Sequence, residues 1–273
     1  IAKPLAFWDE IYTAASKLTL RDAAGNITQS VMALGETRNI ASFKNIFSLL
    51  LLQAGSPVTE LVASPSGAEL RSALLTNPGL PIAPAESALD FYTQFANPSK
   101  LFYSWNRTLP EAQNAFASGD VAYYLGLSSE LPTIRRKAPT LNFALTSVPQ
   151  SRVSGKTLTY GRIYGVAISR GTRNAQAALA AALKIVSAEG ASALGSLFAL
   201  PPARRDLLSG EPAGANDSIF YTAALQERSW LDPEPALTSA LFQEAIESVT
   251  SGRLRTSEAL NAANRKLEDT IRN

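Results

Sequence analysis

The sequence contains neither cysteine nor histidine among its 273 residues. Without cysteine there can be no disulfide and no thiolate chemistry, an absence that suits exported bacterial proteins but also occurs in cytosolic ones. Without histidine, most zinc signatures, the histidine-dependent triads and the commonest general base are excluded. Any catalysis would therefore depend on carboxylates, lysine or tyrosine.

Concentrated charge and long apolar runs are also lacking. The formal net charge is +2, from 25 basic and 23 acidic residues, and the longest basic runs are Arg135-Arg136-Lys137 and the pair Arg204-Arg205. Nucleic-acid binding needs concentrated positive charge, so we expect no nucleic-acid partner. The longest apolar run, "IFSLLLLQAG" at 46–55, is too short to span a bilayer and predicts a buried helix.

The composition is that of a globular protein, with 46% hydrophobic and 18% charged residues. Hydrophobic spacing predicts helices alternating with short strands, an α/β or α+β arrangement. Thr108 and Glu111 form a capping-box pattern at the start of one helix, and Gly119 is placed to end it. The predicted helices lie in 41–53, 84–97, 108–119, 174–200 and 256–273, and predicted strands lie in 27–34, 141–149 and 163–169.

The stretch "FASGDVAYYLGLSSELPTI" at 116–134 joins a helix, a glycine turn, an apolar strand ending at Gly126 and a run of small polar residues. Polar loops at the carboxyl ends of strands are where α/β proteins place their ligand clefts. This stretch therefore predicts one wall of a ligand site.

Several segments occur in the same order as in a known family. The phrase with Phe116, Gly119 and Ala122 matches the family's "F-x-x-G-x-x-A" signature. Together the segments resemble the extracellular solute-binding proteins of bacterial carbohydrate ABC transporters, of the maltose-binding-protein-like type. The segments are "FWDEIYTAASKLTLRDAAGNI", "ALDFYTQFANP", "EAQNAFASGDVAYYLG", "LNFALTSVPQ", "YGRIYGVAIS" and "IESVTSGRLRTSEALNAANRKLEDTI".

The resemblance implies an α/β fold of the periplasmic-binding-protein type II, with two lobes joined by hinge strands. The first segment resembles the stretch reached just after the chain crosses into the C-terminal lobe, and "YGRIYGVAIS" resembles the strand by which it returns. We therefore expect 1–160 plus 228–273 to form the C-terminal lobe, and 161–227 to form part of the N-terminal lobe.

Relatives begin with a signal or lipoprotein segment and a long stretch that builds most of the first lobe, and nothing in this sequence resembles that stretch. We accordingly expect an N-terminally truncated chain with an incomplete first lobe and exposed apolar surface on 161–227. The resemblance also implies a protein exported to the periplasm or cell surface, with membrane association only through a missing N-terminal anchor. Its implied partners are a sugar and the permease subunits of an ABC transporter, with no cofactor, no metal and no catalysis.

Residues that could contact a sugar are small polar residues and aromatics, since hydroxyls and amides bind sugar hydroxyls while aromatic rings stack on the apolar faces of sugar rings. The expected contacts are Thr37, Asn39, Trp105, Asn106, Tyr124, Gly126, Ser128, Tyr160, Gly161 and Trp230, with Tyr123 and Tyr164 as further aromatic candidates.

Each candidate has a structural alternative. Thr37 and Asn39, in "GETRN", could instead cap the following helix. Trp105 lies in a polar loop that favours exposure, or it could cover the start of a helix. Consecutive strand residues face opposite ways, so at most one tyrosine of the pair at 123 and 124 can face a cleft. Trp230 is either a lid over the cleft or the anchor of a surface turn.

Other functions also stay open at this point. Tandem tyrosines occur in iron-binding relatives, but histidine ligands are absent here. A glycoside hydrolase would need two converging carboxylates, whereas the acidic pairs Asp9-Glu10 and Asp232-Glu234 are adjacent or in a turn. A surface scaffold or adhesion module that has lost its solute, or a binder of another small solute, is the remaining alternative.

Overall fold

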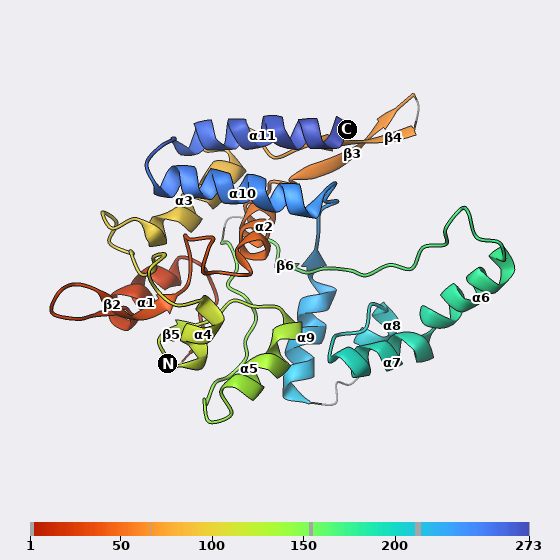
Figure 1. The fold of residues 1–273 in the computed structure, drawn as a ribbon, viewed down its shortest axis with the longest axis horizontal. Helices are drawn as coiled ribbons and strands as arrows, with labels where there is room; N and C mark the ends of the chain where they lie inside the picture. The colour runs from red at the N-terminus through yellow and green to blue at the C-terminus, as the bar shows by residue number, and fades with distance from the viewer. Residues whose placement is uncertain (1–2, 66, 153–154, 211–213, 273) are drawn as a thin grey trace.

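The computed structural model describes residues 3–65, 67–152, 155–210 and 214–272, which form a mixed α/β structure (Figure 1). The helices are α1 Glu10–Leu18, α2 Phe43–Ala54, α3 Pro84–Thr93, α4 Ala112–Ala117, α5 Leu131–Lys137, α6 Ala175–Ile185, α7 Ala188–Phe198, α8 Arg205–Leu208, α9 Ala215–Leu225, α10 Pro235–Thr250 and α11 Thr256–Arg272, with 3₁₀ turns at Gln94–Ala96 and Ser128–Glu130. The strands are β1 Leu20–Arg21, β2 Ile27–Met32, β3 Thr59–Ser64, β4 Gly67–Ser72, β5 Val121–Tyr123, β6 Thr159–Tyr160 and β7 Glu227–Arg228.

The strands that position the candidate site are β2 and β5. They run parallel, with Ser30 opposite Val121 and Met32 opposite Tyr123, and β1 pairs antiparallel with the other edge of β2. β3 and β4 form a separate antiparallel hairpin, and β6 pairs in parallel with β7. The loops after β2 and β5 consequently leave the sheet at the same edge.

Helix α2 lies at the centre of the molecule, as its composition predicts. Nine of its twelve residues are buried, including the polar side chains of Lys44, Ser48 and Gln53. The helix ends at Gly55, whose φ of 102° is left-handed and whose amide donates to the carbonyl oxygens of the last turn. A helix buried on nearly every side can contact several segments of the chain and fix their positions relative to one another.

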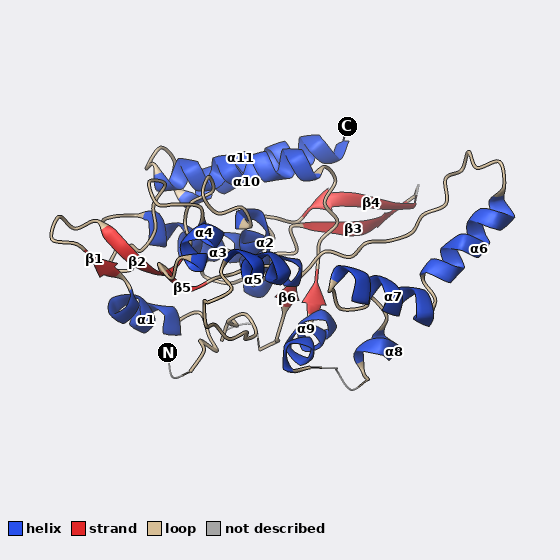
Figure 2. Ribbon diagram, turned by 60° about the horizontal axis from the view of Figure 1, so that its bottom comes forward, coloured by secondary structure: helices blue, strands red, loops and turns tan. Residues whose placement is uncertain are grey.

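Helices α10 and α11 pack against each other and against α3, forming the layer above α2 in Figures 1 and 2. The predicted stripe of α11 is confirmed, because Leu260, Ala263 and Leu267 are buried and Ile271 is partly buried against the core. The buried apolar cluster draws its members from 8–121 and 230–267. None of its members comes from the described residues of 161–227.

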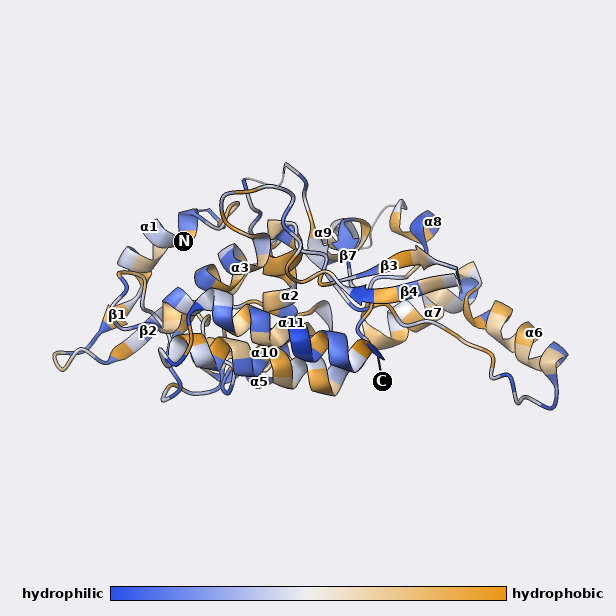
Figure 3. Cartoon of the chain, turned by 90° about the horizontal axis from the view of Figure 1, so that it is seen from above, coloured by the Kyte–Doolittle hydropathy of each residue, from blue (hydrophilic) through white to orange (hydrophobic). Residues whose placement is uncertain are grey.

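The described residues of 161–225 extend away from this cluster, as a long loop leading to α6 and then α7, α8 and α9 (Figure 1). Large apolar side chains are exposed along them, and Figure 3 shows hydrophobic colouring on α6 and α7. The exposed members are Ile163, Tyr164, Val166, Ile168, Leu179, Leu183, Ile185, Val186, Leu194, Leu197, Phe198 and Leu225. The expectation of exposed apolar surface in this region is confirmed.

No single helix among the described residues is long and apolar enough to cross a membrane. Helices α6 and α7 would meet that test only together, and their axes bend by 63° where they join. Ser187 explains the break, since its hydroxyl accepts a hydrogen bond from the amide of Gly190 and so starts a new helix.

Two predicted strands are not formed. Residues 141–149 and 163–169 are not assigned to any strand among the described residues, although their apolar patterns favour extended structure. A strand needs a neighbouring strand for its backbone hydrogen bonds. In the described part of the chain, no strand pairs with either segment. The local pattern is therefore insufficient to predict strand formation.

The capping-box prediction at Thr108 is wrong as well. The N-cap of α4 is Glu111, whose carboxylate accepts from the amides of Gln113 and Asn114. Thr108 belongs instead to a turn in which Asn106 accepts hydrogen bonds from its amide and hydroxyl. At the other end, Gly119 adopts the predicted left-handed conformation, with φ 86°.

Candidate functional site

The loop after β2 makes a close approach that only glycine allows. Gly35 has φ 94°, and a Cβ on it would lie 2.7 Å from both the Cβ and the backbone nitrogen of Ala96. The next residue, Glu36, is buried, and one of its carboxylate oxygens accepts from Arg107 Nε at 3.3 Å. This packing holds the polar residues that follow in a fixed position against the body of the protein.

Thr37 and Arg38 are directed toward α10. The Thr37 hydroxyl donates to Glu247 at 3.0 Å, and Arg38 Nε donates to the same carboxylate oxygen at 3.1 Å. The hydrogen bond from Arg38 is the main cause that lowers the pKa of Glu247 to about 2. Thr37 is thus a buried support residue in this structure, rather than a helix cap or a free hydroxyl.

Asn39 connects this loop to the segment before α4. Its carboxamide nitrogen donates to the carbonyl oxygens of Asn106 and Leu109, at 2.9 and 3.0 Å, and its oxygen accepts from Trp105 Nε1 at 3.1 Å. The expected exposure of Trp105 is wrong, because the side chain is only 1% exposed and its single donor is satisfied. The predicted cap role of Asn39 is also wrong, since Ser42 occupies the N-cap position of α2.

Asn106 uses its side chain within its own turn. Its oxygen accepts from Thr108, and its nitrogen donates to the Tyr103 hydroxyl at 2.8 Å. Asn39, Trp105 and Asn106 therefore lie together and brace one wall of the site.

The loop after β5 places Tyr124 beside Glu130. The Tyr124 hydroxyl donates to this carboxylate, which also accepts from the amide of Leu127 at 2.9 Å. Burial, followed by the hydrogen bond with Glu130, strongly raises the pKa of Tyr124, so the phenol stays protonated at neutral pH. A Cβ on Gly126 would lie 2.6 Å from Tyr124 Cε1, so a larger residue here would require the Tyr124 ring to shift.

Ser128 begins the short 3₁₀ turn that follows, and its side chain is half-buried. No hydrogen bond involves its hydroxyl within the described chain, so this group can hydrogen-bond a solute. Tyr123, one residue before Tyr124, is also partly buried, and burial raises its pKa.

Two crossing segments bring in Tyr160 and Gly161. β6 pairs with β7 through Thr159 opposite Glu227 and Tyr160 opposite Arg228. A Cβ on Gly161 would lie 2.6 Å from Glu227 Cδ, so a larger residue here would require the Glu227 side chain to move. Tyr160 is half-buried, and burial raises the pKa of its hydroxyl.

Trp230 follows β7 and is buried. Its Nε1 donates to the Ser48 hydroxyl at 3.1 Å, and the Lys44 ammonium lies 5.6 Å from its ring centroid. Of the two roles predicted for Trp230, this geometry fits that of an anchor. Tyr164, in contrast, is 82% exposed.

The first half of α2 lies between the two groups of residues. Ser42 donates to the carbonyl oxygen of Leu125 at 3.2 Å, next to Tyr124 and Gly126. One turn later, Asn45 accepts from Arg162 at 3.1 Å, next to Tyr160 and Gly161. The loop after β5 and the crossing segments thus meet along one helix, which brings both tyrosines into one region.

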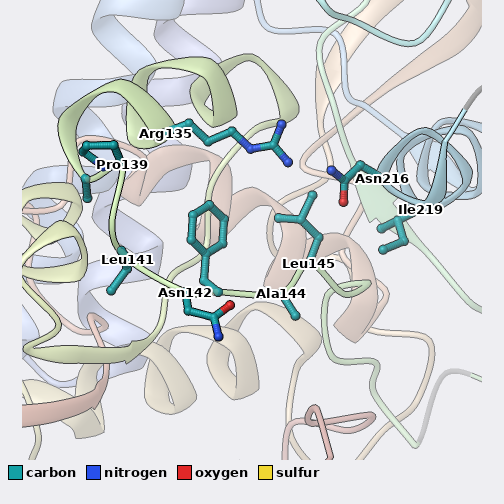
Figure 4. A pocket seen from close by; sticks show the side chains of 10 residues that line it. Arg135, Pro139, Leu141, Asn142, Ala144, Leu145, Asn216 and Ile219 are labelled. Atoms are coloured by element: carbon teal, nitrogen blue, oxygen red, sulfur yellow. The ribbon is translucent and has the colours of Figure 1, made fainter.

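Sequence patterns do not reveal the cavity shown in Figure 4. It has a volume of about 540 Å³ and lies between the end of α5, the segment 138–145 and α9. None of the predicted contact residues lines it. The sequence does not predict this cavity for two reasons. The alternating pattern of 141–145 predicts a strand, and α9 carries no distinctive motif.

Among the described residues, no group of three or more carboxylates could hold a metal ion. The candidate residues described above supply hydroxyls, carboxamides and aromatic rings. These groups suit the binding of a polar, uncharged or anionic small molecule.

Comparison with known proteins assigns the chain to a family. A model of the family described as bacterial extracellular solute-binding protein matches residues 2–221. The match covers well over half of the chain, so the protein belongs to this family, whose members are exported bacterial proteins. No curated protein matches the chain.

Solved structures with the same fold include three that hold sugars. An ABC transporter solute-binding protein from Thermotoga lettingae, bound with α-D-tagatose, has a TM-score of 0.64 and 17% identity, with 98% of this chain and 65% of that chain covered. A cyclo/maltodextrin-binding protein complexed with maltotetraose has a TM-score of 0.72 and 14% identity, with 99% and 66% covered. The maltose/maltodextrin-binding domain MalE from Bdellovibrio bacteriovorus, bound to maltotriose, has a TM-score of 0.65 and 14% identity, with 100% and 68% covered.

The chain thus spans about two thirds of the length of these structures, and just under two thirds of the first two. At such low identity the likeness establishes the fold, which is that of periplasmic-binding proteins.

Proposed function

We propose that this protein is the extracytoplasmic solute-binding component of an ABC importer and that it binds a carbohydrate reversibly for delivery to the permease. Membership of the bacterial solute-binding family supports the transport role. The sugars held by the three structures of like fold support the ligand class. The family is one of binding proteins, and we extend this to the chain itself, which we propose does not turn over its ligand.

The observation that carries the proposal is the meeting of two polar segments along α2. Ser42 ties the loop of Tyr124 to this helix, and Asn45 ties the segment of Tyr160 to it. The half-buried side chain of Tyr160 combines an apolar ring face with a hydroxyl, which is the combination that sugar rings require, whereas the Tyr124 hydroxyl is already bonded to Glu130. Ser128 adds a hydroxyl that is not engaged within the described chain.

We also propose the two-lobe organisation, with 1–160 plus 228–273 as one lobe and 161–227 as part of the other. The absence of the described residues of 161–227 from the buried apolar cluster is consistent with this division. The solute would then lie where the chain crosses between the lobes, close to Tyr160 and Gly161.

Calorimetry and thermal-shift measurements with a panel of neutral monosaccharides and malto-oligosaccharides test the proposal. At least one sugar should stabilise the protein in a concentration-dependent manner. Tyr160→Phe should weaken binding of that sugar by roughly twofold to tenfold, because one hydrogen bond is lost. Tyr164→Phe is the matched control, since Tyr164 is 82% exposed, and it should leave the affinity unchanged.

Stabilisation only by an amino acid, a polyamine or a metal ion would contradict the carbohydrate assignment. A complete lack of response to solutes would favour a scaffold or adhesion module instead. Release of a chromophore from a nitrophenyl glycoside would contradict the binding-only role.

A further inference from the structure

The cavity of about 540 Å³ lies between two parts of the chain that are far apart in the sequence (Figure 4). One side is formed by Arg135 on α5 and the segment 138–145, and the other by Asn216 and Ile219 on α9. Its volume lies within the range of about 300–1,000 Å³ that small-molecule sites occupy. The cavity is therefore large enough for a mono- or disaccharide.

Polar groups in the cavity are not used by the protein itself. The Arg135 guanidinium points across the cavity toward Asn216, and Asn142 lies at another part of the lining (Figure 4). Arg135 and Asn142 are exposed and Asn216 is partly buried, and within the described chain none of these three side chains makes a hydrogen bond or an ion pair. In contrast, Arg152 is paired with Asp9 and Arg204 with Asp206.

Among the described residues that line the cavity, Arg135 alone carries a charge. A guanidinium presents two parallel N–H donors that match a carboxylate, and none of these lining residues is a carboxylate that could compete for them. Phe143, Leu145 and Ile219 supply apolar surface alongside. The lining thus combines one anion-binding group, two carboxamides for hydroxyls and an apolar wall for a ring face.

No residue of the site proposed above lines the cavity, although the two are neighbours. The Phe143 ring packs edge-on against Phe116 at 5.6 Å, and Phe116 stacks on Tyr124 at 5.5 Å. Phe116 therefore stands between Phe143 in the cavity lining and Tyr124 in the proposed solute site.

We propose that this cavity is a second ligand site and that it binds a carboxylate-bearing sugar, such as a hexuronic acid. The carboxylate lies against the Arg135 guanidinium, while Asn142 and Asn216 hydrogen-bond the hydroxyls. A sugar held in this way contacts both α5 and α9 and so restrains their relative movement.

Calorimetry with D-galacturonate and D-glucuronate, compared with D-galactose and D-glucose, tests the proposal. Each acid differs from its neutral partner only at C6, so the comparison isolates the carboxylate. The acids should bind at least tenfold more tightly than the neutral sugars, with an affinity that falls as salt is added. Arg135→Gln should weaken binding of the acids about tenfold or more and abolish their advantage over the neutral sugars.

Arg136→Gln is the matched control, because Arg136 is the next residue on the same helix and is exposed, as Arg135 is, but does not line the cavity. It should bind both acids as the unaltered protein does, and both variants should keep the unaltered melting temperature. Tyr160→Phe should also retain binding of the acids, which separates this site from the proposed solute site. Equal binding of acids and neutral sugars, full binding by Arg135→Gln, or loss of acid binding in Tyr160→Phe would overturn the proposal.

Discussion

The ammonium nitrogen of Lys44, on α2, lies 2.6 Å from a carboxylate oxygen of Asp232, in the segment that joins β7 to α10. Lys44 is buried, and it also donates to the carbonyl oxygen of Pro235 at 2.8 Å and to the Thr238 hydroxyl at 2.6 Å. The crossing segment that carries Trp230 is therefore fixed to the central helix by a buried cation.

Removing the counter-charge should consequently be costly. We expect Asp232→Ala to lower the free energy of unfolding by about 3 kcal/mol, because it leaves a buried ammonium without its partner. Urea denaturation followed by tryptophan fluorescence measures the change. Combining Asp232→Ala with Lys44→Met should recover part of the loss, since the uncompensated charge is then removed as well.

The pair Lys266 and Glu244, between α11 and α10, serves as an exposed control. Glu244→Ala should change the free energy of unfolding by no more than about 1 kcal/mol. If the two alanine variants lose similar stability, the interpretation of Lys44 as a buried anchor is incorrect.

A second prediction concerns Gly35. Alanine at this position would need a left-handed backbone, with φ 94°, and would place its Cβ 2.7 Å from the backbone nitrogen of Ala96. Gly55 has a similar φ of 102°, but a Cβ added there would have no atom within 4 Å among the described residues. Gly55→Ala should cost about 1 kcal/mol, from backbone strain alone, and Gly35→Ala at least about 2 kcal/mol. Urea unfolding of both variants gives the difference, and equal losses would argue against a steric role for Gly35.

The elements that could be predicted from the sequence are those in which local pattern and packing agree. Helix α2 is apolar nearly all round, and it is the central buried helix. The stripe of α11 likewise faces the core. In both cases the side chains that define the pattern also make the contacts, so no long-range information was needed.

Trp105 shows why the environment of individual site residues could not be predicted. Its polar neighbours along the chain favour exposure, yet the partner of its indole is Asn39, 66 positions earlier. Residues 163–169 show the same limit for a strand, because extended structure depends on a hydrogen-bonding neighbour that the described chain does not provide. The predicted solute contacts themselves remain proposals, and binding measurements on their variants will test them.

The carboxylate of Glu247 should make stability depend on pH. Its folded-state pKa is lowered to about 2, mainly by the hydrogen bond from Arg38, against an ordinary value of 4.5. A lowered pKa adds stability above the unfolded-state value, and this stability is lost as the pH falls from about 4.5 toward about 2. The stability difference between the unaltered protein and Glu247→Gln should therefore be full at pH 6 and shrink progressively below pH 4.5.

Urea denaturation at several pH values between 2.5 and 6 measures this effect. At pH 6, Arg38→Met should lower the free energy of unfolding by part of the amount that Glu247→Gln loses, because it removes the largest cause of the pKa shift of Glu247. A stability difference that stays constant down to pH 2.5 would contradict the predicted role of Glu247.

The exposed apolar side chains of α6 and α7 lead to the last prediction. Leu197 is 75% exposed and Phe198 is 60% exposed, and they lie among the other exposed apolar residues of 161–225. Exposed apolar surface favours association in water. We expect the polypeptide of residues 1–273 to self-associate reversibly as its concentration rises, which sedimentation velocity would detect. Leu197→Glu with Phe198→Glu should reduce the association, whereas Leu101→Glu, at an 85% exposed position outside this region, should not. If the polypeptide stays monomeric at high concentration, or if both variants behave alike, this apolar surface does not drive association.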